Sequence, residues 1–155
     1  MNNKEKFINK AVELARKNVL AGKGGPFAAL IVKDDKIISY GYNQVTSKKD
    51  PTLHAEIDAI RKAAKKLKTF DLSGCEIFSS CYPCPMCFSA IYWANIKKVY
   101  YSATKEVADK HGFKDNKIYN ELKTKIKSIK FIEIKVKDFS LPFKEWENKK
   151  DKIKY

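Results

Sequence analysis

The 155-residue sequence contains only two arginines, Arg16 and Arg61, so 30 of its 32 basic residues are lysines. A net charge of +14 is compatible with nucleic-acid binding. Base and phosphate recognition, however, favours the bidentate guanidinium group of arginine. The basic residues are also spread along the chain, with 17 in residues 1–104 and 15 in residues 105–155. We therefore interpret the charge as a lysine-rich solvated surface and keep a nucleic-acid partner as a less favoured alternative.

Long apolar runs are also missing. No stretch approaches the roughly 20 residues of a membrane-spanning helix, and the N-terminal segment MNNKEKFINK lacks the apolar core of a signal peptide. We therefore expect a cytoplasmic protein without a membrane partner. In that compartment the four cysteines, all between Cys75 and Cys87, are expected to be reduced or metal-bound instead of disulfide-paired. No repeat or linker divides the chain, so residues 1–155 are predicted to form one domain.

The hydrophobic periodicity predicts helices that alternate with strands. Helices are expected at residues 4–22, 53–67, 85–96 and 143–155, and a partly helical region at 105–125. Strands are expected at 76–80, 97–103 and 130–136, with two more in residues 24–43 around a turn at 33–36. This alternation predicts an α/β fold in which helices cover both faces of a sheet.

Three cysteines, Cys81, Cys84 and Cys87, lie within seven residues. Pro85 suits the first position of a helix, so Cys84 would form the N-terminal cap and Cys87 would lie one turn in. The positive end of the helix dipole and the unpaired N–H groups there favour thiolates. We interpret Cys81 as the end of a buried strand and Cys75 as a small core residue.

A histidine lies thirty residues upstream of this pair, in the segment His54-Ala55-Glu56 at the predicted start of a helix. Side chains two residues apart do not share one side of a helix, so His54 and Glu56 could reach one site only off the helix's N-terminal end. Two helix N-termini facing one metal would supply His54, Cys84 and Cys87 as ligands and leave Glu56 beside the open position, which is the catalytic arrangement of zinc. The alternative is a closed structural site, whose fourth ligand would be His111, Cys75 or Cys81.

H-x-E followed by P-C-x-x-C is the signature of zinc-dependent deaminases. The sequence resembles the cytidine-deaminase-like superfamily and, within it, the bacterial guanine deaminases over nearly its full length. The segments PCPMC with AIYWA, and GFKDNKIY, resemble the guanine branch specifically. Tyr82 departs from the pattern, because these deaminases typically carry glutamate there. The other matching segments are GGPFAALIVKD, DPTLHAEIDAIRKA and LPFKEW, followed by a C-terminal tyrosine.

The resemblance implies a three-layer α/β sandwich around a mixed five-stranded sheet, and a homodimer in which the C-terminal segment, about 140–155, is exchanged between subunits. It implies one Zn²⁺ per subunit, held by His54, Cys84 and Cys87. The implied reaction is hydrolysis of guanine to xanthine and ammonia by a zinc-bound hydroxide. Glu56 would shuttle the protons.

Further roles follow from the resemblance alone. Asp115 would be a second catalytic residue that binds the guanine edge and assists proton transfer. The implied substrate-binding residues are Phe27, Asn43, Ala55, Trp93 and Tyr155. Ordinary structural roles are the alternatives: core packing for Phe27 and Trp93, a helix cap for Asp115, and a strand end for Asn43.

Three functional hypotheses remain open. The first is a deaminase of guanine or of a related small molecule such as guanosine, cytosine or an aminotriazine. The second is a tRNA adenosine deaminase that forms inosine, which shares the motif and would make use of the positive charge. The third is a non-catalytic zinc fold used for assembly.

Overall fold

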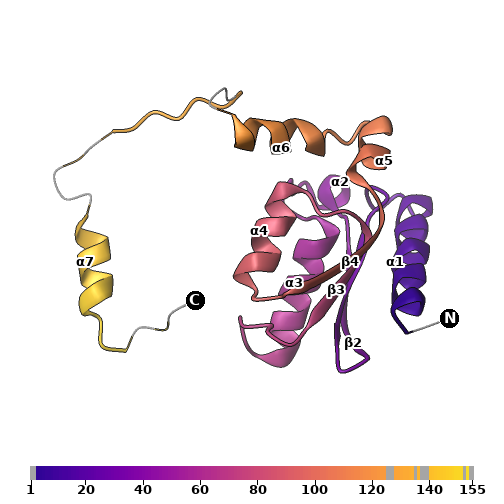
Figure 1. Ribbon diagram of the computed structural model, residues 1–155, viewed down its shortest axis with the longest axis horizontal. Coiled ribbons are helices and arrows are strands. Elements are labelled where there is room, and N and C mark those ends of the chain that lie inside the picture. The colour runs from indigo at the N-terminus through magenta and orange to yellow at the C-terminus, as the bar shows by residue number, and fades with distance from the viewer. Residues whose placement is uncertain (1–2, 125–127, 135, 137–139, 152, 154–155) are drawn as a thin grey trace.

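The computed structural model describes residues 3–124, 128–134, 136, 140–151 and 153 (Figure 1). In chain order its elements are α1 (Asn3–Leu20), β1 (Ala28–Lys33), β2 (Lys36–Tyr42), α2 (Val45–Lys48), α3 (Ala55–Leu67), β3 (Glu76–Cys81), α4 (Pro85–Trp93), β4 (Lys98–Ala103), α5 (Lys105–Lys110), α6 (Asp115–Lys123) and α7 (Leu141–Asn148).

The four strands form one mixed sheet in the order β2-β1-β3-β4. Strand β1 is antiparallel to both neighbours, and β3 and β4 are parallel. Helix α1 covers one face, and α3 and α4 cover the other (Figure 1). The first five residues of β1 are buried because both faces of this central strand are covered. The expected α/β sandwich with a mixed sheet is therefore confirmed.

The prediction of a fifth strand at residues 130–136 is wrong. Residues 130–134 and 136 have no strand structure, and Phe131 and Ile134 are more than 80% exposed. Alternating apolar residues favour a strand, but a strand also needs a hydrogen-bonding neighbour, and here the segment runs away from the sheet (Figure 1). Strand β4 is consequently an edge strand within the described part of the chain.

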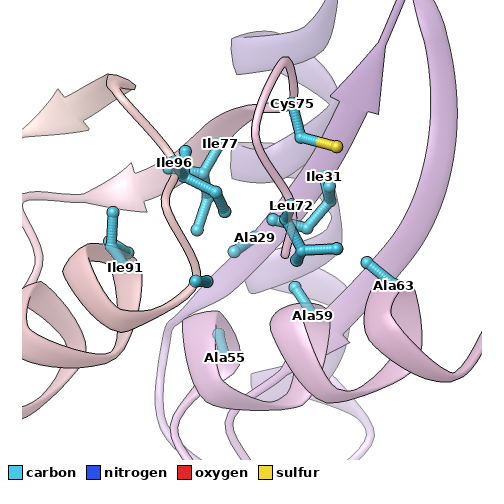
Figure 2. Packing of buried hydrophobic residues seen from close by; sticks show 11 residues of the cluster. Ala29, Ile31, Ala55, Ala59, Ala63, Leu72, Cys75, Ile77, Ile91 and Ile96 are labelled. Atoms are coloured by element: carbon cyan, nitrogen blue, oxygen red, sulfur yellow. The ribbon is translucent and has the colours of Figure 1, made fainter. Parts of the chain in front are cut away.

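The main core lies between the sheet and helices α3 and α4, as Figure 2 shows. Helix α3 contributes Ala55, Ala59 and Ala63, all fully buried and spaced four residues apart, so the helix packs closely on the sheet. Gly41 of β2 makes this approach possible, because a Cβ there would overlap the Ala55 carbonyl oxygen and the Ala59 side chain. The close packing fixes the first turn of α3, which directly follows His54.

The two cysteines outside the C-x-x-C pair lie as predicted. Cys75 belongs to the main core, and Cys81 is the buried last residue of β3. All four cysteines are free thiols.

Several boundaries differ from the predicted ones. Helix α2 was not expected, and the region 105–125 contains two helices, α5 and α6. Helix α7 ends at Asn148, earlier than predicted. No helix in the described ranges is long and apolar enough to cross a membrane.

Lysines of α3 cover the outer edge of β2. The Lys62 ammonium donates to the Tyr40 carbonyl at 3.2 Å, and the Lys66 ammonium donates to the Ile38 carbonyl at 3.0 Å. The Tyr42 N–H donates to the Asp58 carboxylate at 3.0 Å. Backbone groups at this edge are thus bonded to side chains of the same chain.

Candidate metal centre and active site

Two helix N-termini bring the predicted ligands together. His54 is the N-cap residue of α3 and Cys84 is the N-cap residue of α4, both with extended backbone, and Cys87 lies in the first turn of α4. Pro85 occupies the first turn of α4, where its missing N–H costs no hydrogen bond. One ligand atom from each of the three residues lies within 4.8 Å of the other two.

The spacing of these atoms suits tetrahedral zinc. The His54 Nδ1 atom lies 3.5 Å from Cys84 Sγ and 3.6 Å from Cys87 Sγ. Zinc bonds of about 2.3 Å to sulfur and 2.0–2.1 Å to nitrogen separate such ligand atoms by roughly 3.6 Å in a tetrahedron. Within the described residues no fourth histidine, cysteine or carboxylate joins the group, so the closed alternative with His111, Cys75 or Cys81 is not formed.

The two thiols of this group differ in acidity. A hydrogen bond from Cys87, helped by His54, lowers the pKa of Cys84 to about 4. The same pairing, together with burial, raises the pKa of Cys87. Cys84 is therefore the more acidic of the two thiols, and a metal would bind both residues as thiolates with release of protons.

Glu56 lies beside the three ligands and is 5% exposed. Its Oε1 accepts a hydrogen bond from Ser79 Oγ at 2.8 Å, and its Oε2 lies 3.3 Å from Cys87 Sγ. Burial raises the pKa of Glu56 above the ordinary glutamate value, while the Ser79 hydrogen bond opposes the rise. A carboxyl group whose pKa is raised in this way holds a proton more readily than an exposed glutamate, which suits a group that takes up and releases protons during a reaction.

A cavity of about 420 Å³ opens in front of this group. Glu56 and Asp115 both line it, together with Tyr82 and Phe113. Asp115 is the first residue of α6. Burial raises the pKa of its carboxyl, and the negative charge of the Cys84 thiolate raises it further. The cavity thus carries two carboxyl groups with elevated pKa values.

Asn43 lines the same cavity at the end of β2. Its Oδ1 accepts from the Gly25 N–H at 3.1 Å and from the Val45 N–H at 3.4 Å, so its amide NH₂ can donate to a ligand. Asn18 of α1, which is buried, donates its amide to the carbonyl oxygens of Gly25 at 3.0 Å and Asn43 at 2.8 Å. The sequence analysis missed Asn18, although an asparagine among the apolar residues of α1 is a signal for such a role.

Four predicted substrate-binding residues remain. Phe27 lines the cavity and packs edge-on against Phe113, with ring centroids 4.7 Å apart. Ala55 is fully buried and is not among the residues that line the cavity. Trp93, on α4, is 59% exposed and is not among the residues that line the cavity. Tyr155 lies outside the described residues.

The sequence matches the model of a known protein family. The cytidine and deoxycytidylate deaminase zinc-binding region matches residues 1–103, which include the three candidate ligands and Glu56. The protein belongs to this family of zinc-binding deaminases.

Individual relatives show which deaminases in this family the chain is similar to. The chain is 46% identical to the guanine deaminase of Bacillus subtilis over 155 residues, 99% of each chain. The X-ray structure of guanine deaminase from that organism superposes with a TM-score of 0.95 and covers 100% of this chain and 99% of that one. A tRNA-specific adenosine deaminase of Aquifex aeolicus is 41% identical over 109 residues, 70% of each chain. A structure of guanine deaminase from Nitrosomonas europaea has a TM-score of 0.67 at 34% identity and covers 70% of this chain and 63% of that one.

Proposed function

We propose that this protein hydrolyses guanine to xanthine and ammonia. The observation that carries the proposal is the 46% identity to a guanine deaminase over the whole chain. The matched chain includes Asp115, which lies in the cavity beside Glu56. A cavity of about 420 Å³ lies within the usual size range of small-molecule sites.

One zinc ion per subunit, bound by His54, Cys84 and Cys87, would supply a water molecule of lowered pKa. Glu56 accepts a proton from the attacking water, since its buried carboxylate lies beside the ligands. It delivers this proton to the ring nitrogen next to carbon 2. It then takes the second proton from the hydroxyl group now bound to carbon 2 and passes it to the amine, which leaves as ammonia when its bond to carbon 2 breaks. The elevated pKa of Glu56 suits both roles, because its carboxyl group must be protonated and deprotonated in each catalytic cycle.

Three side chains of the cavity hold the base. Asp115 accepts hydrogen bonds from the N–H groups of the guanine edge and assists proton transfer. Asn43 donates its amide NH₂ to the base, because its Oδ1 already accepts two backbone N–H groups. Phe27 stacks on the purine ring, and its own packing against Phe113 fixes the ring plane.

Ala55, Trp93 and Tyr155 complete the proposed site. Ala55 acts through its backbone N–H, which belongs to the first turn of α3, where N–H groups lack partners within the helix. Trp93 lies on the exposed face of α4, so we assign it a role at the cavity only in the assembled dimer. Tyr155 would reach the active site of the partner subunit.

The proposed assembly is a homodimer of one-domain subunits that exchange the C-terminal segment from about residue 140. Large apolar side chains of α7 support it: Leu141, Phe143 and Trp146 are all more than 40% exposed. Burial of such side chains is worth about 1.5–3 kcal/mol each. We place the protein in the cytoplasm, where thiol ligands stay reduced.

The first test is ammonia release by the zinc-loaded protein from guanine, guanosine, adenine, cytosine, cytidine and an aminotriazine, with Glu56→Gln as the blank. We expect release from guanine and a loss of roughly 10²–10⁴-fold in the variant at unchanged zinc content. A variant that keeps full activity would remove Glu56 from the mechanism. Zinc-loaded wild type that releases nothing from any of these compounds would refute the proposal.

The tRNA adenosine deaminase activity is the second candidate. It is favoured by the net charge of +14 and by the 41% identity to the Aquifex aeolicus enzyme. A tRNA with adenosine at the wobble position therefore belongs in the same assay. RNA binding through phosphate contacts should weaken steeply as salt rises. Turnover of the tRNA without turnover of guanine would establish this second function in place of the first.

A further inference from the structure

Helix α6 carries Asp115 to the cavity but has no buried residue among its nine. Ile118 and Leu122 point outward and are about half and two-thirds exposed. Burial of apolar side chains therefore does little to fix where this helix lies. Its position must depend on the few contacts that its partly buried residues make.

One of these contacts comes from Tyr119. Its hydroxyl donates a hydrogen bond of 2.7 Å to the carbonyl oxygen of Pro83, the residue just before the ligand Cys84. Asp115 and Tyr119 are four residues apart and so lie on the same side of α6. A single hydrogen bond thus joins the helix that carries Asp115 to the segment that carries a metal ligand.

The surroundings of Tyr119 support a fixed position. Its ring lies 6.2 Å from the ring of Tyr82, which lines the cavity, and the Lys105 ammonium lies 5.4 Å from the Tyr119 ring centroid. Burial raises the pKa of Tyr119, so the hydroxyl keeps the proton that it donates. On the other side of Asp115, the Phe113 ring packs against Phe27. Asp115 therefore lies between two anchored aromatic residues.

We propose that Tyr119 is a positioning residue of the active site: its hydrogen bond to the Pro83 carbonyl holds Asp115 over the cavity at the place where the substrate edge binds. The inference rests on the proposed function, because it acts on substrate through Asp115. It assigns the tyrosine no contact with substrate or metal.

The test is a double-mutant cycle on substrate affinity. Each protein carries Glu56→Gln, so that zinc-loaded protein binds guanine without turnover, and affinity is measured by equilibrium dialysis. Tyr119→Phe removes only the hydroxyl, and we expect guanine to bind about five- to tenfold more weakly. In the Asp115→Asn background the same change should alter affinity by less than about twofold, because the effects of substitutions at two residues that act as a unit are not additive.

The matched control is Tyr100→Phe. Tyr100 is also partly buried, and its hydroxyl bonds to Glu76 at 3.4 Å away from the cavity, so guanine affinity should not change. Equal effects of Tyr119→Phe in both backgrounds, or none in either, would overturn the inference. A loss of zinc from Tyr119→Phe would also overturn it, since the tyrosine would then act through Cys84. Failure of the Glu56→Gln parent to bind guanine would instead count against the proposed function.

Discussion

Residues 3–124, here called the body, and the described residues between 128 and 153, here called the distal segment, place apolar side chains in opposite ways. In the body Ile31 and Phe78 are fully buried, whereas in the distal segment Ile134 and Phe131 are 81% and 82% exposed. The residue types are the same, so composition does not explain the difference. The body closes its core within one chain, whereas the exposed apolar side chains of the distal segment are available for the subunit contact proposed above. Catalysis and assembly should therefore respond to different substitutions.

The largest effect should come from the body. Cys84→Ala removes a thiolate ligand, and we expect loss of zinc and at least about a 10³-fold fall in guanine turnover, since water without a metal has a pKa of 15.7 instead of about 7. Wild-type protein from which a chelator has removed the zinc should show the same fall in guanine turnover, and turnover should recover when zinc is added back. Sedimentation should show unchanged assembly for both. Dissociation of Cys84→Ala into monomers would mean that site and assembly are not separate.

A second substitution tests how the body positions the site. Gly41→Val places a side chain where the Ala55 carbonyl and Ala59 already lie. Such overpacking should cost about 2–3 kcal/mol of unfolding free energy and lower Tm by roughly 4–12 °C. Gly74→Val is the contrasting variant, because no atom lies within 4 Å of a Cβ there, although its positive φ adds backbone strain. A smaller loss in Gly41→Val than in Gly74→Val would contradict the close packing of α3 on β2.

The third prediction concerns the distal segment. We include Phe131 in the interface of the proposed homodimer because it is 82% exposed. Phe131→Ala should then raise the dissociation constant of this dimer at least tenfold, because burial of a phenylalanine side chain is worth about 1.5–3 kcal/mol. Zinc content should stay the same. Lys130→Ala, one residue earlier, is the control and should leave the dissociation constant unchanged. Analytical ultracentrifugation measures both, and equal behaviour of the two variants would place Phe131 outside the interface.

The smallest effect should be a shift in pH dependence. The Ser79 hydroxyl stabilises the Glu56 carboxylate and so lowers the pKa of Glu56 against the larger effect of burial. The carboxylate is the active base, so kcat/KM should fall as the pH drops through this pKa. Ser79→Ala raises the pKa and should move the acid limb of the profile to higher pH. Ser80→Ala, in the next position, is the control and should leave the acid limb where it is. An acid limb that moves to lower pH in Ser79→Ala would contradict the role assigned to Ser79.

Local signals were sufficient for most helices and strands of the body, though not for α2, and for the candidate metal-binding residues. The apolar period of α1, the uninterrupted apolar run of β1 and the proline after Cys84 each reflect chemistry contained within a few residues. The convergence of His54 with Cys84 and Cys87 could also be predicted, because the N-terminal end of any helix presents unpaired N–H groups and the positive end of the helix dipole.

Contacts between residues far apart in the sequence could not be predicted from local sequence patterns. Asn18 acts on Asn43, which is 25 residues away, and Tyr119 acts on Pro83, which is 36 residues away. Gly41 matters because of a helix that begins fourteen residues later. The segment at 130–136 has the pattern of a strand, yet pattern alone does not provide the neighbouring strand that would complete it.

The side-chain bonds along β2 have a consequence for how copies of this protein can associate. Fibrils of stacked strands require molecules that offer a free backbone edge on both sides. Here Lys62, Lys66 and Asp58 bond to backbone groups of β2, while β4 is the edge strand at the other side of the sheet. Among the described strands the sheet thus has one free edge, that of β4, which can accept one added strand, and polymerisation through the sheet stops there.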